Sequence, residues 1–149
     1  HKCKRLISDI NKDMSIIVSS QLPVGSCREL LSYAQSLNRP FNIDVLCIPE
    51  NLRLGNAYDV FLNPDRIIVG VNPETNVRQL SQLFGRLEDK LIYMSLESVE
   101  MCKHAINAFL ATSIAFANEI AKVCEISGAD AVDVSIGLKS DHKHGTHFA

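Results

Sequence analysis

Short apolar runs alternate with helix-like segments along the first two thirds of the chain. The runs have the length and β-branched content of buried strands, and they lie at 14–19, 43–50, 66–71 and 90–95. Helical patterns precede or separate them at about 1–12, 27–37 and 77–87, with Leu6, Ile7 and Ile10 facing inward in the first. Residues 51–66, rich in Gly, Asn and Pro, are expected to form a loop. This alternation predicts an α/β fold with a parallel sheet and right-handed crossovers.

The pattern changes at Ser98, where one long helix is predicted to run to about Ile126. At 1.5 Å per residue it would be about 40 Å long. Gly128 is its expected C-cap, and Asp130 is expected to cap a short helix that ends near Gly137. Apolar residues surround nearly the whole long helix, so we expect protein to cover it on several sides. Between Ala105 and Cys124 the only polar side chains are Asn107, Thr112, Ser113, Asn118, Glu119 and Lys122.

Composition limits the classes of partner. The chain has 149 residues, 46% hydrophobic and 21% charged, with a net charge of −2. Because it has no long run of Lys or Arg, we expect neither nucleic acid nor an anionic membrane as a partner. Charged and amide residues interrupt the long apolar segment and no signal peptide precedes it, so we predict no membrane span and a cytoplasmic protein. Five cysteines without a CxxC pair indicate free thiols.

Two polar residues on the long helix are the first candidates for chemistry. Lys103 and Asn107 lie one helical turn apart and therefore share a face. A lysine in a cleft can stabilise an oxyanion or donate a proton, and an amide beside it can hold a hydroxyl or a water. The alternative, which composition alone favours, is that Lys103 extends its amine to the surface and Asn107 bonds locally.

Further candidates follow the predicted strands. Pro49 and Glu50 come just after a strand, where open α/β sheets place their ligands, so Glu50 is a candidate acid, base or water-positioning group. Gly25 begins a helix whose free N–H groups could meet an anion, although either segment could also be a simple turn. The helix dipole could activate Cys27, but no neighbouring acid or histidine is evident and a buried structural role is favoured.

The tail of the chain is polar and carries three of its five histidines. A zinc site there is a minor alternative to a solvated tail, because no spaced acidic or thiol partner accompanies the histidines. We therefore predict no metal. These residues are His142, His144 and His147.

Three long segments, in order, resemble the UDP-glucose/GDP-mannose dehydrogenase family. "SSQLPVGSC" resembles the family's "STVPVGT", and "PENLRLGNAYDVFLNPDRIIVG" resembles "PEFLREGxAxxDFxxPDRIVIG". "SVEMCKHAINAFLATSIAFANEIAKVCEISGADAVDV" is similar to the start of the family's central helical domain. The resemblance implies that 1–96 are the C-terminal part of a Rossmann-like NAD-binding domain. It implies that 97–149 begin an all-α domain through which the protein forms a homodimer.

The resemblance also implies an activity, the NAD-dependent oxidation of the C6 alcohol of a UDP-sugar to a carboxylate, used in polysaccharide biosynthesis. A cysteine would capture the aldehyde, and a second NAD⁺ would oxidise the adduct. By this analogy Lys103 would stabilise the oxyanion, Asn107 would hold a water or the sugar oxygen, and Glu50 would position the hydrolytic water. Gln21 and Pro23 would lie near the cofactor. The loop lining the sugar nucleotide would contain Asn51, Leu52 and Arg53.

The sequence departs from the family pattern at several places. Gln21 replaces a threonine, and Leu54 replaces the second glutamate of "PEFLRE". Neither the GxGxxG segment nor the "GGSCFPKD" nucleophile segment occurs in this sequence, so we expect the chain alone to be inactive. Two alternatives are a β-hydroxyacid dehydrogenase, which also has a lysine and an asparagine one turn apart on a long helix, and a non-catalytic dimerisation module.

Overall fold

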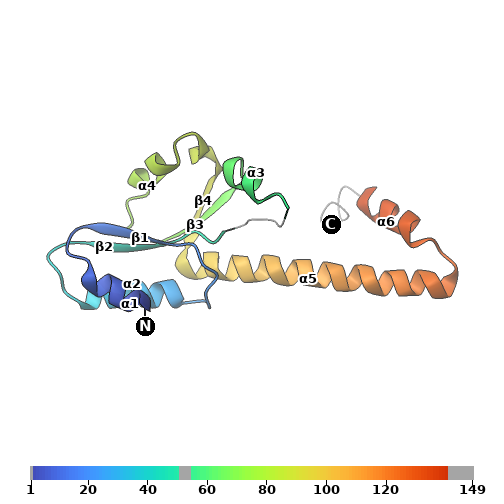
Figure 1. Cartoon of the computed structure of the whole chain (residues 1–149), viewed down its shortest axis with the longest axis horizontal. Coiled ribbons are helices and arrows are strands. Elements are labelled where there is room, and N and C mark those ends of the chain that lie inside the picture. Colours follow the sequence, from blue (N-terminus) through green and yellow to red (C-terminus); the bar gives the residue numbers. More distant parts are fainter. Residues whose placement is uncertain (1, 51–54, 141–149) are drawn as a thin grey trace. The chain divides into compact units, whose positions relative to one another are not determined.

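The computed structural model describes residues 2–50 and 55–140 (Figure 1). The chain divides into two compact units, 1–103 and 104–149, with the longest helix passing from the first into the second. The elements of the first unit are α1 (Lys2–Asp9), β1 (Met14–Val18), α2 (Ser26–Ser36), β2 (Ile43–Cys47), α3 (Ala57–Leu62), β3 (Ile67–Val71), α4 (Val77–Phe84), the 3₁₀ helix η1 (Gly85–Lys90) and β4 (Leu91–Ser95). They are followed by α5 (Leu96–Ser127) and α6 (Ala131–Ser140).

The four strands form one sheet in the order β1-β2-β3-β4. β1 pairs with β2 in parallel, and β3 pairs with β4 in parallel. The prediction of an all-parallel sheet is wrong at the centre, where β2 and β3 are antiparallel and joined by a single bridge between Cys47 and Gly70. The alternation of strand and helix does not determine the direction of each strand. A buried strand has the same apolar run whether it is parallel or antiparallel to its neighbour.

The pairing brings the carboxyl-terminal parts of all four strands together. Cys47 lies opposite Val18 on one side and Gly70 on the other, and Gly70 lies opposite Met94. The two parallel pairs therefore meet near their carboxyl ends despite the reversal of direction. α5 begins immediately after β4 and so starts beside this meeting point.

The two central strands of the sheet, β2 and β3, are buried, whereas the edge strands β1 and β4 are partly exposed. Figure 1 shows α1 and α2 on one side of β1 and β2, with α4 on the other side. Because side chains alternate along a strand, Val45 and Cys47 join the core with α2, whereas Leu46 joins a smaller core that includes Phe84 of α4. The larger core comprises Ile7, Cys27, Leu30, Leu31, Ala34, Ile43, Val45, Cys47, Ile68, Leu96 and Val99.

Three local predictions need correction. Leu6, expected to face inward, is 66% exposed, whereas Ile7 is buried. Residues 51–66, expected to be a loop, contain the six-residue helix α3, which buries no side chain and thus has no apolar stripe to reveal it. The helix expected at 77–87 ends at Phe84, and η1 follows from Gly85, whose φ is +48°.

In the second unit, the predicted caps are confirmed. Gly128 ends α5 with φ +76°, and the N–H groups of Gly128 and Ala129 donate to the Cys124 carbonyl. Asp130 caps α6, its Oδ1 accepting a hydrogen bond of 2.7 Å from the Val132 N–H. α6 runs three residues beyond Gly137, to Ser140. Among the described residues, no helix has both the length and the apolar character needed to cross a membrane.

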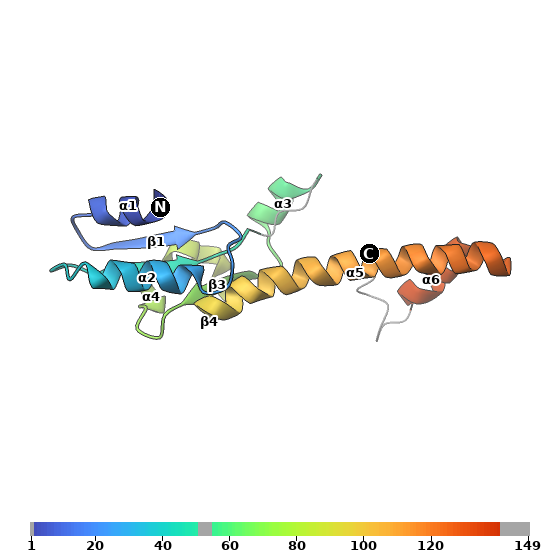
Figure 2. The same cartoon turned by 90° about the horizontal axis from the view of Figure 1, so that it is seen from below.

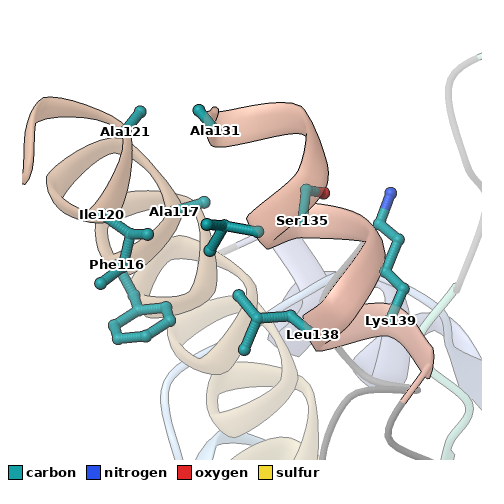
Figure 3. A pocket seen from close by; sticks show the side chains of 9 residues that line it. Phe116, Ala117, Ile120, Ala121, Ala131, Ser135, Leu138 and Lys139 are labelled. Atoms are coloured by element: carbon teal, nitrogen blue, oxygen red, sulfur yellow. The ribbon is translucent and has the colours of Figure 1, made fainter. Parts of the chain in front are cut away.

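α5 and α6 enclose a shallow apolar groove, seen close by in Figure 3. Phe116, Ala117 and Ile120 line it from α5, and Ala131 and Leu138 line it from α6. Many large apolar side chains of α5 are exposed in this single chain, so the expected cover on several sides of the helix stays a prediction. They are Met101, Phe109, Leu110, Ile114, Val123 and Ile126, together with Phe116 of the groove.

Candidate functional site

The predicted lysine and carboxylate lie together. The Lys103 side chain is only 13% exposed, and its Nζ lies 4.0 Å from Glu50 Oε1. The amine donates a hydrogen bond of 2.7 Å to the Glu50 main-chain carbonyl. Lys103 therefore holds the segment after β2 and does not extend its amine into bulk solvent. The Glu50 side chain is 53% exposed at the same place.

The segments after β1 and β2 lie side by side because their pairing continues past the strands. The Ile48 N–H donates to the Val18 carbonyl, and the Glu50 N–H donates to the Ser19 carbonyl. This ladder places Glu50 next to the loop that contains Gln21 and Pro23, both of which are exposed. Three sequence-predicted residues, Gln21, Pro23 and Glu50, thus share the carboxyl edge of β1 and β2.

Asn107 lies one turn after Lys103 on α5, is exposed in this chain and belongs to the second unit. Other predicted residues, Asn51, Leu52, Arg53, Leu54, His142, His144 and His147, lie outside the described residues.

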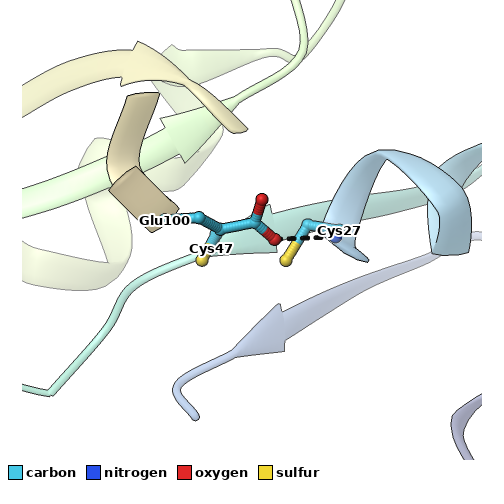
Figure 4. Close-up of side chains that lie close together, drawn as sticks. All are labelled: Cys27, Cys47 and Glu100. Carbon is cyan, nitrogen blue, oxygen red and sulfur yellow. Dashed lines mark hydrogen bonds between the residues drawn. The ribbon is translucent and has the colours of Figure 1, made fainter. Parts of the chain in front are cut away.

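The predicted anion site at the start of α2 is filled by the chain's own Glu100 (Figure 4). Glu100 is 2% exposed. Its Oε2 accepts a hydrogen bond of 2.6 Å from the Gly25 N–H, and its Oε1 accepts one of 2.8 Å from the Cys27 N–H. Gly25 has φ +92°, a conformation that favours glycine. The carboxylate therefore satisfies the helix end and faces the positive end of its dipole.

Sequence reasoning missed Glu100. Its neighbours Val99 and Met101 gave one available signal, a carboxylate between apolar residues near the start of an apolar helix. A buried carboxylate needs hydrogen-bond donors, and the N–H groups at a helix start are a ready source. The partner lies 75 residues away along the chain, however, and only the fold identifies it.

Two buried thiols accompany this carboxylate. The Sγ atoms of Cys27 and Cys47 and a Glu100 oxygen all lie within 4.8 Å of one another, close enough to hold a metal ion. A hydrogen bond with Cys47, burial and the nearby Glu100 carboxylate raise the pKa of the Cys27 thiol. Metal binding would need both thiols ionised next to a carboxylate whose two oxygens already accept N–H groups. The arrangement favours a protonated, structural pair, as predicted for Cys27, and all five cysteines are free.

A second carboxylate on α5 holds the next residue of α2. Glu97 accepts hydrogen bonds from Arg28 Nε at 2.8 Å and Arg28 Nη2 at 3.3 Å. Arg28 Nη1 also donates to Asn72 Oδ1 in the segment after β3. The bond from Arg28 lowers the pKa of Glu97, and the same contact raises the pKa of Arg28. The arginine therefore ties α2 to both the start of α5 and the end of β3.

Two domain models of one family match consecutive parts of the chain. Residues 1–88 match the NAD binding domain of the UDP-glucose/GDP-mannose dehydrogenase family, and residues 97–149 match the central domain of the same family. The resemblance of the three sequence segments is thereby confirmed, and the β-hydroxyacid dehydrogenase alternative is not supported.

Named relatives agree with the family models. The chain is 39% identical over 145 residues to UDP-glucose 6-dehydrogenase of Rickettsia conorii, a match covering 97% of the chain and 33% of that protein. It is 37% identical over 148 residues to a UDP-glucose 6-dehydrogenase of Bacillus subtilis, covering 97% of the chain and 33% of the relative. The chain thus spans about a third of the length of the curated relatives it matches.

Solved structures share the fold. A UDP-glucose dehydrogenase from Pyrobaculum islandicum superposes with a TM-score of 0.80 at 28% identity, over 97% of this chain and 34% of that one. A GDP-mannose dehydrogenase from Pseudomonas aeruginosa also gives 0.80, at 21% identity, over 97% of this chain and 35% of that one. With 88 consecutive residues matched by the NAD-binding model, the chain belongs to the UDP-glucose/GDP-mannose dehydrogenase family.

Proposed function

We propose that this chain is part of an NAD-dependent nucleotide sugar dehydrogenase that oxidises the C6 alcohol of a UDP-sugar to a carboxylate. The observation that carries the proposal is the position of Lys103, largely buried and bonded to the Glu50 carbonyl at the carboxyl edge of β1 and β2. Relatives called UDP-glucose 6-dehydrogenase, at 34–40% identity, support a UDP-sugar substrate.

The side chains at this edge could form the hydrogen bonds and apolar contacts that a nicotinamide ring with its carboxamide needs. The Gln21 side chain offers both a donor and an acceptor, which is the complement of a carboxamide, and Pro23 presents an exposed apolar surface beside it. The N–H groups of Gly25 and Cys27 already bind Glu100, so we do not assign a phosphate to the start of α2. Bound NAD⁺ would accept the hydride from the sugar alcohol.

Lys103 supplies the electrostatic part of the proposed mechanism. Its ammonium group would stabilise the oxyanion that develops as the alcohol loses its proton and hydride. Partial burial of Lys103 strengthens this interaction, because water screens a charge less in a partly buried site than in bulk solvent. Oxidation of the cysteine adduct would give a thioester. Glu50 would position the water that hydrolyses this thioester, and Asn107 would hold a water or the sugar oxygen. Asn51, Leu52 and Arg53 would line the sugar nucleotide.

For the homodimer, we propose that the exposed apolar face of α5 is covered by α5 of a second copy. Support comes from side chains such as Phe109, Leu110 and Ile114, each about half exposed on one helix that also bears the proposed site. We assign 97–149 to this dimerisation domain and 1–96 to the NAD-binding domain. The free thiols fit a cytoplasmic protein.

Substitution at the proposed interface tests the dimer. In the complete protein, Ile114→Glu is expected to convert a dimer to a monomer in size-exclusion chromatography with light scattering, with helical content retained. Glu119→Gln, on the exposed surface of the same helix, is the control and should remain dimeric. A complete protein that is monomeric at micromolar concentration would contradict the proposal.

The activity test uses the complete protein, of which this chain is a part. We expect NADH to form when UDP-glucose or a related UDP-sugar is added with NAD⁺, with two NADH produced per sugar carboxylate. Calorimetric titrations should give binding of both ligands. Reduction of NAD⁺ with a hydroxyacid but with no UDP-sugar would refute the proposed substrate class, and absence of NAD⁺ binding would refute the dehydrogenase itself.

A further inference from the structure

Three charged residues in the first two turns of α5 hold two segments of the first unit, the start of α2 and the segment after β2. Glu97, Glu100 and Lys103 are spaced three residues apart and therefore lie along one face of the helix. Glu97 binds Arg28 in α2, Glu100 binds the N–H groups at the start of α2, and Lys103 binds the Glu50 carbonyl after β2. α5 thus joins the segments that follow β1 and β2.

Glu100 supplies a cap that α2 lacks in its own sequence. Gly25, at the N-cap position, has no side chain with which to accept from the first N–H groups of the helix. Both oxygens of the Glu100 carboxylate accept instead, at 2.6 and 2.8 Å. Since Glu100 is almost fully buried, no water can replace the carboxylate without rearrangement of the core.

This cap also determines where the preceding loop lies. The Ser26 N–H and Oγ both bond to the Pro23 carbonyl, so the turn from Pro23 into α2 is closed. A carboxylate that holds the Gly25 N–H therefore holds Pro23 through this turn, and Gln21 lies only two residues before it. Glu100, which lies one turn before Lys103 on α5, therefore determines the position of this loop relative to Lys103.

We propose that Glu100 is a positioning residue for cofactor binding, which fixes the loop containing Gln21 and Pro23 in register with Lys103 by capping α2 from α5. The inference rests on the proposed function, because it assigns the loop to NAD⁺. Because Glu100 is only 2% exposed, we assign it no direct contact with the cofactor or the substrate. Its effect passes through the Gly25 and Cys27 N–H groups to the loop.

The test is Glu100→Gln in the complete protein. Glutamine keeps the size of the side chain and one acceptor oxygen, but its NH₂ group faces an N–H donor in place of the second oxygen. We expect the dissociation constant for NAD⁺ to rise about tenfold in calorimetry, whereas that for UDP-glucose changes less than about twofold. Amide exchange at Gly25 and Cys27 should become roughly tenfold faster or more. Glu29→Gln, at an exposed glutamate on α2, is the matched control and should change neither affinity.

Each outcome decides between the claims. If wild type does not bind NAD⁺, the proposed function fails; if wild type binds it and Glu100→Gln binds equally well, only the positioning role fails. Faster amide exchange with unchanged NAD⁺ affinity, or equal losses for both ligands, would show a structural cap and overturn the inference. If Glu100→Gln does not fold, Glu97→Gln decides, because its half-exposed side chain holds the adjacent Arg28. It must then raise the NAD⁺ dissociation constant by about two- to threefold.

Discussion

The first turns of α5, up to Lys103, and the remainder of the same helix are both rich in apolar residues but differ in environment. Leu96, Val99 and Glu100 are buried against the sheet and α2. From His104 onward, side chains as large as Phe109 and Ile126 are exposed in this chain, Ile126 by 88%. Apolar residues at the start of the helix stabilise the first unit, whereas those farther along remain available for another surface.

The difference shows why an apolar helix can bear polar chemistry. In the first turns, each buried charged group has a partner within the unit, as Glu100 has in the Gly25 and Cys27 N–H groups. Beyond Lys103, ion pairs such as Lys122 with Glu119 lie on the surface, both side chains being about two-thirds exposed. Position relative to the sheet, and not hydrophobicity of the helix, distinguishes the candidate site from the candidate interface.

Two lysines on α5 provide the largest expected effect. Lys103→Ala in the complete protein should lower turnover at least about 10²-fold, because it removes the ammonium proposed to stabilise the oxyanion. Lys122→Ala removes only a surface ion pair and should change turnover less than about twofold. Steady-state kinetics of the two variants measure the difference. Near-normal turnover of Lys103→Ala, or equal losses for both, would erase the proposed distinction between the two parts of the helix.

Two glycines provide the next largest effect. A Cβ added at Gly70 would lie 2.3 Å from Val99 Cγ1 and 3.2 Å from Cys47 Cβ, so Gly70→Ala should force the start of α5 away from the sheet. We expect a loss of about 3 kcal/mol in the free energy of unfolding, at the upper end of overpacking effects. It is measured by urea denaturation.

Gly137→Ala is the matched control in the second unit. Within the described part of the chain, no atom outside the local helix backbone lies within 4 Å of the added Cβ, and alanine is the better helix former inside α6. The control should therefore be neutral or stabilise by up to about 1 kcal/mol. A tolerated Gly70→Ala would mean that the start of α5 is not packed tightly on the strands.

Local patterns in the sequence predicted most of the elements. The run at 66–71 became a strand because apolar residues buried on both faces leave a continuous apolar signal. The run at 14–19 also became a strand, although Met14 and Ile17 are exposed. Gly128 and Asp130 acted as predicted, since capping depends on one residue and its immediate neighbours. The carboxyl edge that bears Glu50 also followed, because β1 and β2 are parallel.

Features that depend on distant partners could not be predicted in this way. The antiparallel step between Cys47 and Gly70 has no signature in either strand. Glu100 required knowledge that the start of α2 lies against α5, and the helix α3 buries no side chain that would have produced a periodic pattern. The N–H groups at the start of α2 do meet an anion, as expected from Gly25. That anion is the carboxylate of Glu100, which only the fold brings to this place.

α6 is capped by a residue next to it in the sequence, Asp130, whereas α2 is capped by the distant Glu100, and the two caps can be compared directly. This residue caps α6 from the adjacent position, with Oδ1 2.7 Å from the Val132 nitrogen and 3.4 Å from the Asp133 nitrogen. Asp130→Ala should cost about 1 kcal/mol of stability in thermal or urea unfolding, and Asp130→Asn, which retains an acceptor, only a few tenths. Because this cap lies in the second unit, NAD⁺ affinity should not change, in contrast to Glu100→Gln. A lowered NAD⁺ affinity in Asp130→Ala would remove that contrast.

The smallest effect concerns the ion pair at the start of α5. Arg28 holds the pKa of Glu97 below its usual value, so the pair contributes stability above the unfolded-state pKa of about 4.3, and the contribution is lost as pH falls through the lower folded-state value. The Glu97 side chain is 40% exposed, so solvent screening limits the contribution to less than about 1 kcal/mol. Urea denaturation should find wild type slightly more stable than Glu97→Gln near pH 7, with the gap closing below about pH 4. A gap that persists in acid would mean that Glu97 stabilises the helix junction through packing and not through its charge.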